Sequence, residues 1–404
     1  MQIEMFGALC VKCKGSRNLC GLNYCPLLDQ VSGLLPKLEL NKTEFFGQAP
    51  PSVFIGRHNY PNVFVGPMVS EANREIGNPE EWYGREMLDI AMKASSLVRP
   101  SKIMNVHNVS GQSIEASQEI AMSSKPIDAE IILEKPYYSA KSTVDMFVHP
   151  MGPSVEMKSI RLVENPPVPR KVDYLVSDTD LKASKAVIYL YNGNIPFSQI
   201  QRILSVGLLG VKNERKMVPT RWSITATDDI IGKELIKEVK HFSLLEEYRV
   251  FYNNYVGNTF YILLIPRIWS FEMIELWQRG SFYASENVGD GDFEDYNGRK
   301  SYASNVEGAY YSARLAVLEY LKKIQRQASV LVYREISPEY SIPLGVWVIR
   351  ESVRDAMNLE HRTFESLGEA MSYVNNRITG KNLFKKSNLI TRIKTQRTLD
   401  DRYP

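Results

Sequence analysis

Four cysteines lie within sixteen residues, and the rest of the 404-residue sequence contains none. Their spacing is Cys-x2-Cys-x6-Cys-x4-Cys, at positions Cys10, Cys13, Cys20 and Cys25. Such a cluster forms either two disulfide bonds in an oxidising compartment or one metal site in a reducing one. The opening segment MQIEMFGALCVKC lacks the basic leader, apolar core and cleavage site of a signal peptide. We therefore expect a cytoplasmic protein, in which the metal site is favoured over disulfides or free thiols.

The spacing predicts a closed, structural zinc site. A Cys-x2-Cys pair forms a tight knuckle that directs two thiolates at one ion, and the second pair completes the tetrahedron that zinc prefers. Gly15 and Gly21 permit the turns, and we expect Lys12, Lys14 and Arg17 to offset the thiolate charge. These basic residues suit either a solvated loop or a contact with nucleic acid. No fifth ligand is evident nearby, so we expect a folding role for the metal and no catalytic one.

Bulk properties exclude few functions. A net charge of +3 is nearly neutral for this length, so it neither requires nor rules out a nucleic-acid partner, since a local basic patch can act alone. The longest apolar run, FYILLIP, is far shorter than the ~20 residues that span a bilayer. We therefore expect no membrane partner, and a chain of this length has room for two or three domains.

Helical and strand patterns alternate irregularly, which predicts an α+β fold with short antiparallel strands. A sequence echo, Pro51–Gly56 and Pro61–Gly66, predicts two strands around the turn at residues 57–60. Periodicity predicts further strands over residues 154–163, 248–252, 259–265, 330–335 and 345–350. It predicts helices over residues 82–98, 111–123, 179–191, 197–208, 306–327 and 364–378.

Four regions follow from these patterns: a zinc module (1–30), a larger α+β domain (31–285), a smaller α+β region (286–380) and a flexible basic tail (381–404). The polar, glycine-rich segment 285–301 reads as a mobile junction. Its acidic residues do not have the spacing of a calcium-binding helix–loop–helix, because the required glycine and final glutamate are missing. We interpret it as a solvated linker, with its carboxylates at Asp290, Asp292, Glu294 and Asp295.

The turn at residues 57–60 is the first candidate site. Turns between rigid strands often carry functional side chains. His58 could act as an acid or base, and Arg57 could hold a phosphate. The alternative, which we favour, is a hairpin turn whose polar residues face water.

The segment VPTRWSITATDD is the second candidate. Arg221 beside Trp222 suits a phosphate contact next to a stacking platform for a base, although a structural role is equally compatible. Basic residues precede the pair at Lys212, Arg215 and Lys216. Asp228 and Asp229 could bind a metal, but we favour a helix start in which Thr227 is the cap and the acids offset the helix dipole.

Known catalytic signatures are not found: there is no phosphate-binding Walker loop, nucleophile elbow, His-Glu-x-x-His or dinucleotide fingerprint. The residues alone therefore give no case for an enzyme. The final stretch QRTLDDRYP is more informative, because Gln396, Leu399 and Tyr403 fall at i, i+3 and i+7. On one helical turn, Leu399 and Tyr403 would project to one side. The alternative is a frayed basic tail.

These segments together resemble the archaeal NreA family of DNA repair proteins. The resemblance rests on the cysteine cluster, PPSVFIGRHNYPNVFVGP, VPTRWSITATDD, REISPEYSIPLGVWVIRE and the final stretch, and it covers nearly the whole chain. It implies a role in the DNA-damage response, in partnership with the DNA sliding clamp (PCNA). Carried over by position, the four cysteines would bind zinc, and Gln396, Leu399 and Tyr403 would meet the clamp. Arg402 departs from the clamp-docking pattern, which has an aromatic residue there.

Two hypotheses follow. The first is a repair factor that is tethered to the clamp by its tail and contacts nucleic acid through basic and aromatic residues. The second is an enzyme acting on nucleic acid or a nucleotide, with Arg57, His58, Arg221 and Asp228 around one cleft. The second requires residues about 160 positions apart to meet in space.

Overall fold

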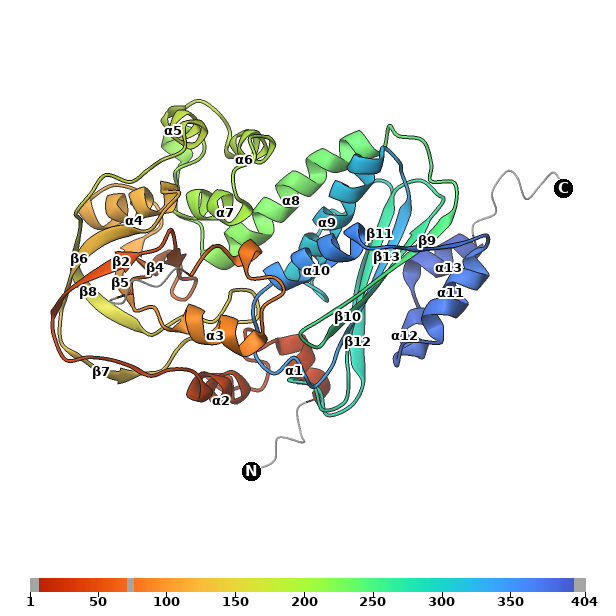
Figure 1. Cartoon of the computed structure of the whole chain (residues 1–404), viewed down its shortest axis with the longest axis horizontal. Helices are drawn as coiled ribbons and strands as arrows, with labels where there is room; N and C mark the ends of the chain where they lie inside the picture. The colour runs from red at the N-terminus through yellow and green to blue at the C-terminus, as the bar shows by residue number, and fades with distance from the viewer. Residues whose placement is uncertain (1–6, 71–75, 396–404) are drawn as a thin grey trace. The chain divides into compact units, whose positions relative to one another are not determined.

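Two six-stranded sheets, formed by different parts of the chain, carry the fold (Figure 1). The computed structural model describes residues 7–70 and 76–395. The chain divides into two units: the 28–231 unit, which includes residues 343–345, and the 232–395 unit, which includes residues 7–27. Among the described residues each six-stranded sheet is antiparallel except for one parallel pair. The predicted α+β class is therefore confirmed.

The sheet of the 28–231 unit contains the sequence echo. Val53–Ile55 (β3) and Asn62–Pro67 (β4) pair antiparallel, so the predicted hairpin is confirmed. The predicted strand at 154–163 is β8 (Ser154–Leu162), and it pairs in parallel with β5 (Arg99–Asn105). The order is β2-β6-β8-β5-β4-β3, with β2 at Glu44–Ala49 and β6 at Ile127–Leu133. A separate pair joins β1 (Leu38–Leu40) to β7 (Tyr137–Ala140).

The helices predicted over residues 82–98, 111–123, 179–191 and 197–208 are present in the 28–231 unit to within a few residues, except that the first starts five residues late. The helices at Pro26–Leu34 and Arg170–Ser177 were not predicted. Ile114 and Ile120 on α4, and Ile200 and Ile203 on α7, have no exposed surface. On α4 the fully buried Ile114, Ser117 and Ala121 follow three- and four-residue spacing, so one face of this helix packs inward, whereas α7 is buried at nearly every position. The helices of this unit include α2 (Pro26–Leu34), α3 (Met87–Ser95), α4 (Gln112–Met122), α5 (Arg170–Ser177), α6 (Ala183–Asn192) and α7 (Phe197–Ser205), with short 3-10 turns at Pro79–Glu81 and Lys212–Glu214.

The sheet of the 232–395 unit is covered on both faces (Figure 1). Helices α9 (Gly308–Ile324) and α10 (Trp347–Asn358) cover one face, and α11 (Leu367–Asn375), α12 (Lys381–Lys385) and α13 (Asn388–Thr395) cover the other. Every residue of the central strands β11 and β13 is buried, as expected for a strand between two layers. The order is β12-β11-β13-β10-β9-β14, with β9 at Tyr248–Tyr255, β10 at Asn258–Ile265, β11 at Ser270–Trp277, β12 at Val288–Glu294, β13 at Ser329–Ile336 and β14 at Arg362–Phe364.

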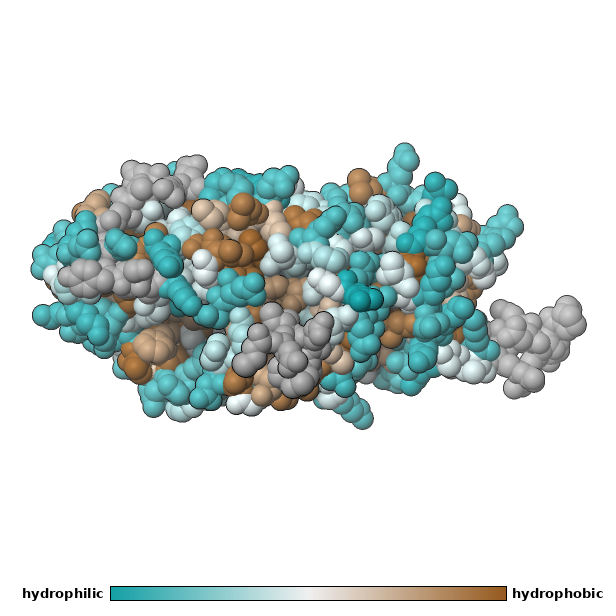
Figure 2. Space-filling model, turned by 90° about the horizontal axis from the view of Figure 1, so that it is seen from below, coloured by the Kyte–Doolittle hydropathy of each residue, from teal (hydrophilic) through white to brown (hydrophobic). Residues whose placement is uncertain are grey.

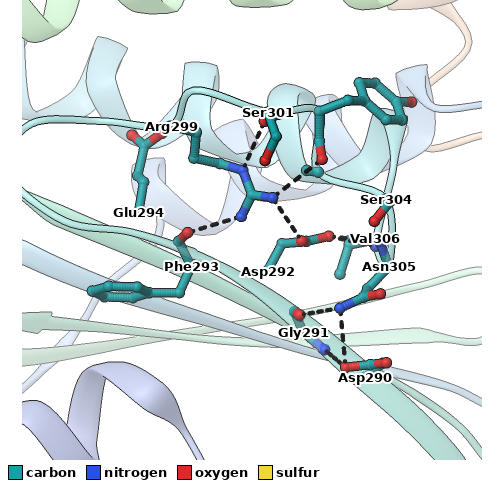
Figure 3. Close-up of polar contacts among 12 residues, drawn as sticks. Asp290, Gly291, Asp292, Phe293, Glu294, Arg299, Ser301, Ser304, Asn305 and Val306 are labelled. Carbon is teal, nitrogen blue, oxygen red and sulfur yellow. Dashed lines mark hydrogen bonds and ion pairs between the residues drawn. The ribbon is translucent and has the colours of Figure 1, made fainter.

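The prediction of a solvated linker at 285–301 is wrong, because residues 288–294 form edge strand β12 (Figure 3). Asp292 and Glu294 are buried, and each is neutralised by an arginine: Arg299 lies 3.0 Å from Asp292, and Arg314 lies 2.7 Å from Glu294. Arg299 also donates to backbone carbonyls, including that of Phe293, which fastens the following loop to the strand. The acidic composition of the segment suggested a solvated loop. The arginines that neutralise its carboxylates are not close to them in sequence, because Arg299 lies near the end of the segment and Arg314 lies beyond it.

Two further predictions, a strand over residues 345–350 and a flexible tail from residue 381, are wrong in the described part of the chain. The strand predicted over residues 345–350 is the start of helix α10, whose buried Ile349, Val353 and Ala356 follow helical spacing. A short apolar run does not by itself distinguish a strand from a helix. The segment 381–395 is also no flexible tail. Phe384, Leu389 and Ile390 are buried in the core of this unit.

A buried carboxylate holds the last described helix in place. The backbone N–H groups of Asn388 and Leu389 donate to Glu272 on β11, each at 2.9 Å, and Ser387 donates its hydroxyl to the same carboxylate. Glu272 thus satisfies N–H groups at the start of α13, which have no partner within the helix. Burial raises the pKa of Glu272, although these hydrogen bonds oppose the shift.

The sequence contains 44% hydrophobic residues, and some of their side chains reach the surface. The face seen in Figure 2 is mainly hydrophilic, with hydrophobic side chains in several small patches. None of the helices in the described ranges has the length and apolar character needed to cross a membrane.

Candidate functional site

A pocket of about 170 Å³ lies in the 28–231 unit beside the turn that joins β3 to β4. The backbone N–H of Ile55 donates to the Thr220 hydroxyl at 2.9 Å, which attaches the start of helix α8 (Thr220–Val239) to β3. Arg221 is thereby brought next to Arg57 and His58, although about 160 residues separate them. The lining is Phe54, Ile55, Gly56, Arg57, His58, Phe64, Arg99, Ser101, Thr143, Asp145, Val148, Met151, Ser154 and Arg221.

The pocket is strongly basic. Three arginines and one histidine line it, against one carboxylate, Asp145. Burial lowers the pKa of His58, and the charges of Arg57 and Arg221 lower it further, while Asp145 opposes them. His58 is therefore mainly neutral at pH 7 and can accept a proton or a hydrogen bond. Three guanidinium groups around one pocket favour an anionic ligand.

Exposed aromatic rings adjoin this pocket. Tyr60 in the β3–β4 turn and Trp222 on α8 each expose 44% of their surface, and their ring centroids are 5.3 Å apart. The guanidinium carbon of Arg221 lies 3.3 Å from the centroid of the Phe147 ring, which fixes the plane of the charged group. Charge for a phosphate and an aromatic platform for a base thus lie side by side.

The remaining residues of the second candidate site are placed elsewhere. Arg215 points inward and donates to the backbone carbonyls of Val176 and Asp178 at 2.9 and 2.8 Å, so it has a structural role. Lys212 and Lys216 are exposed but do not line the pocket. The proposed cap at Thr227 is wrong, because α8 begins at Thr220 and Thr227 donates to Ser223 within the helix. Asp228 is fully buried on α8 and is not part of the pocket.

The cysteine segment lies in the 232–395 unit. Cys10 and Cys13 belong to helix α1 (Gly7–Cys13), whereas Cys20 and Cys25 come after it. None of the four cysteines forms a disulfide bond. Burial raises the pKa of Cys10 to about 11, and the charges of Cys25, Cys13 and Cys20 add to the shift. Within the described ranges, however, no three side chains of His, Cys, Asp or Glu are arranged to hold a metal ion.

The segment that follows Cys13 directs backbone N–H groups at its sulfur. Burial alone would raise the pKa of Cys13, but four backbone N–H groups donate to its sulfur and lower it. The donors are Leu19, Arg17, Gly15 and Asn18. Gly15 and Gly21 both have positive φ, as the turns require.

The expected charge balance between the thiols and nearby cations is wrong for two of the three basic residues. Lys14 is buried and lies 3.1 Å from Glu275 on β11. Arg17 pairs with Glu307 and donates to the carbonyl of Ser304. Both side chains therefore attach the cysteine segment to the rest of its unit, whereas Lys12 is exposed.

Comparison with known proteins shows the family. The model described as "Archaeal Nre, N-terminal" matches residues 19–284, and that described as "Archaeal Nre, C-terminal" matches residues 294–402. The chain belongs to the archaeal Nre family. No solved structure matched it.

Relatives of this Nre chain carry informative names. It is 38% identical to "DNA repair protein NreA" of Archaeoglobus fulgidus over 380 residues, covering 93% of this chain and 95% of the relative. It is 36% identical to "DNA repair protein NreB" of the same organism over 96% of this chain and 98% of the relative. A "DNA repair protein NreA" of Haloferax volcanii is 36% identical over 84% and 86% of the respective chains.

The two regions of the Nre chain that the family models match contribute strands to one sheet. Strands β9, β10 and β11 come from the N-terminal region, whereas β13 and β14 come from the C-terminal region. Because β13 lies between β10 and β11, neither region forms this sheet alone.

The predicted clamp-docking residues of the Nre chain are not covered by the structure, and one residue of the pocket was not predicted. Gln396, Leu399, Arg402 and Tyr403 are outside the described residues. Sequence reasoning missed Arg99, which lines the pocket from the first position of β5. An arginine directly after the apolar pair Leu97 and Val98 was the available signal, since charged residues are rarely buried without a partner.

Proposed function

We propose that this chain is a DNA-repair factor that contacts nucleic acid through the pocket of the 28–231 unit and docks on the DNA sliding clamp through its C-terminal residues. One observation carries the nucleic-acid contact: Arg57, Arg99 and Arg221 gather beside the exposed rings of Tyr60 and Trp222. Guanidinium groups bind phosphate oxygens in pairs, and aromatic rings stack on bases of any sequence. The names of the Nre relatives support the repair context.

Removing the aromatic platform tests the nucleic-acid contact. We expect Trp222→Ala to weaken binding of single-stranded DNA about tenfold, because stacking contributes ~1–3 kcal/mol per base. Fluorescence anisotropy with a labelled oligonucleotide measures this. Tyr174→Ala is the matched control, since Tyr174 is an exposed ring on α5 of the same unit. Equal affinity for Trp222→Ala and the wild-type protein would remove the proposed contact.

We also propose that Cys10, Cys13, Cys20 and Cys25 bind one structural zinc ion. Four cysteine thiolates are a common ligand set for structural zinc, and hydrogen bonds from backbone N–H groups to a sulfur commonly support thiolate ligands. The metal would stabilise this segment and would take no part in a reaction. Native mass spectrometry should detect one zinc per chain, and Cys13→Ser should lose it. Metal-free protein with unchanged stability would contradict the site.

A second candidate function is hydrolysis of a phosphoester in the same pocket. The observation that favours it is the joint presence of His58, Arg57 and Arg221, with a lowered histidine pKa. His58 would take a proton from an attacking water, and the water oxygen would bond to phosphorus while the P–O bond to the leaving alcohol breaks. The protonated His58 would then return its proton to the leaving oxygen, and the arginines would stabilise the charge that develops on the phosphoryl oxygens. Formation of product by the wild-type protein and not by His58→Ala would establish it, whereas binding without turnover would leave the first function.

A further inference from the structure

Arg99 forms the floor of the pocket and is the most deeply buried of its charged residues. Only 6% of its surface is exposed. Its Nη2 donates to the Thr143 hydroxyl at 3.0 Å, its Nη1 lies 3.6 Å from the sulfur of Met151, and its guanidinium carbon lies 4.6 Å from the centroid of the Phe54 ring. All of these partners are neutral. Its Nε has no hydrogen-bond partner in the described part of the chain.

A buried guanidinium without a counter-charge is strongly unfavourable. No carboxylate among the described residues forms an ion pair with Arg99, and burial lowers its pKa to about 10. Since this pKa is still well above 7, the group keeps its positive charge inside the fold. The described residues supply no carboxylate in contact with Arg99, so we infer that its stabilising partner is an anion from outside.

The rest of the pocket suits an anion that enters end-on. Arg57 and Arg221 add two positive charges, and the hydroxyls of Ser101 and Ser154, which are 2.7 Å apart, add hydrogen-bonding groups to the lining. At about 170 Å³ the pocket is smaller than the ~300–1,000 Å³ that complete small ligands occupy. It accommodates a terminal group and not a whole nucleotide.

We propose that this pocket binds a phosphomonoester dianion, with Arg99 as the deep contact and Tyr60 and Trp222 receiving the attached base outside. An internal phosphodiester has a nucleotide on each side, so it cannot reach a guanidinium that is 94% buried, whereas a terminal phosphate can. The inference rests on the proposed contact with nucleic acid, in which the phosphorylated end of a strand supplies the group. A free nucleoside monophosphate has the same chemistry.

Oligonucleotides with different terminal groups distinguish a phosphorylated DNA end from a free nucleoside monophosphate as the ligand. Binding is measured for single-stranded oligonucleotides that are identical except for a 5′-phosphate, a 3′-phosphate or hydroxyl groups at both ends, and for a deoxynucleoside monophosphate, all at one ionic strength. We expect one phosphorylated end to bind about tenfold more tightly than the hydroxyl ends, because charge-assisted hydrogen bonds are added. We expect Arg99→Gln to lose this preference. Arg161→Ala should keep it, because Arg161 is an exposed arginine on β8 of the same unit.

The results separate the terminal-phosphate site from the proposed contact with nucleic acid on which it rests. Equal binding of all three oligonucleotides to the wild-type protein would overturn the terminal-phosphate site and leave the proposed function standing. Binding of the monophosphate alone would support the site and overturn the contact with DNA. A folded Arg99→Gln protein that keeps the preference would overturn the inference. If that variant does not fold, Arg57→Ala, at the turn beside the pocket, replaces it and should reduce the preference.

Discussion

Replacing Glu275 by glutamine is expected to destabilise the 232–395 unit by about 3–5 kcal/mol, the usual cost of removing one partner from a buried ion pair. Glu275 lies between Lys14 and Arg334, and each of the three exposes 6% of its surface or less. Arg334 also donates to Asn258 through Nε at 3.0 Å. The variant would leave two buried cations facing a neutral amide. Urea-induced unfolding monitored by circular dichroism measures the loss.

The effect should depend on pH in a defined direction. Burial opposes ionisation of Glu275, but the charges of Lys14 and Arg334 outweigh it and hold its pKa below the ordinary 4.5. The stabilisation is thus complete above pH 4.5 and is lost as the pH falls toward the lowered native pKa, because the unfolded chain takes up the proton first. The difference between the variant and the wild-type protein should shrink in that window.

An exposed pair on helix α8 provides the matched control. Glu234→Gln disrupts the ion pair with Lys237, whose side chain is 72% exposed, and should change stability by less than ~0.5 kcal/mol. Similar unfolding midpoints for Glu275→Gln and Glu234→Gln would contradict the importance of the buried network.

Deleting residues 396–404 is expected to abolish binding to an archaeal sliding clamp without changing the stability of the fold. The deletion removes Gln396, Leu399 and Tyr403, which carry the resemblance to a clamp-docking peptide. Surface plasmon resonance with immobilised clamp measures the binding. Arg402→Phe, which restores the aromatic residue of the pattern, should increase affinity. Clamp binding equal to that of the intact protein would rule out the docking role.

A longer deletion tests the contribution of helix α13 to stability. Removing residues 387–404 also removes buried Leu389 and Ile390 and leaves the Glu272 carboxylate without Ser387 and the N–H groups of α13. We expect it to destabilise the 232–395 unit by at least ~3 kcal/mol, because two large apolar side chains lose their burial. Equal thermal unfolding of the two truncated proteins would contradict this contribution of α13.

Local patterns were sufficient for much of the fold. The paired echo around residues 57–60, strand β8 and helix α4 follow from alternation or helical spacing within one short segment. Strand β12 was not predictable in this way. Its Gly289 approaches β11 so closely that a Cβ atom would lie 2.3 Å from the Glu275 carbonyl, so the glycine serves close packing and not flexibility.

The candidate site was only partly predictable from the sequence, because several of its residues come from segments that are far apart in the chain. Arg57 and His58 were recognisable because they stand in a turn, and Arg221 because it adjoins Trp222. The floor of the pocket depends on Arg99, Thr143 and Met151, which the fold brings together from separate segments. No spacing rule within one segment connects these residues, and the burial that makes Arg99 informative exists only in the folded chain.

The Lys14–Glu275 contact has a consequence for synthesis. The two residues are 261 positions apart, so the segment with all the thiols leaves the ribosome long before its anchoring strand exists. At translation rates of ~5–20 residues per second, this interval is roughly 10 to 50 seconds. Throughout that time the nascent thiols have no fixed place in a native structure. The cysteine segment is therefore among the last parts of the 232–395 unit to reach its final position.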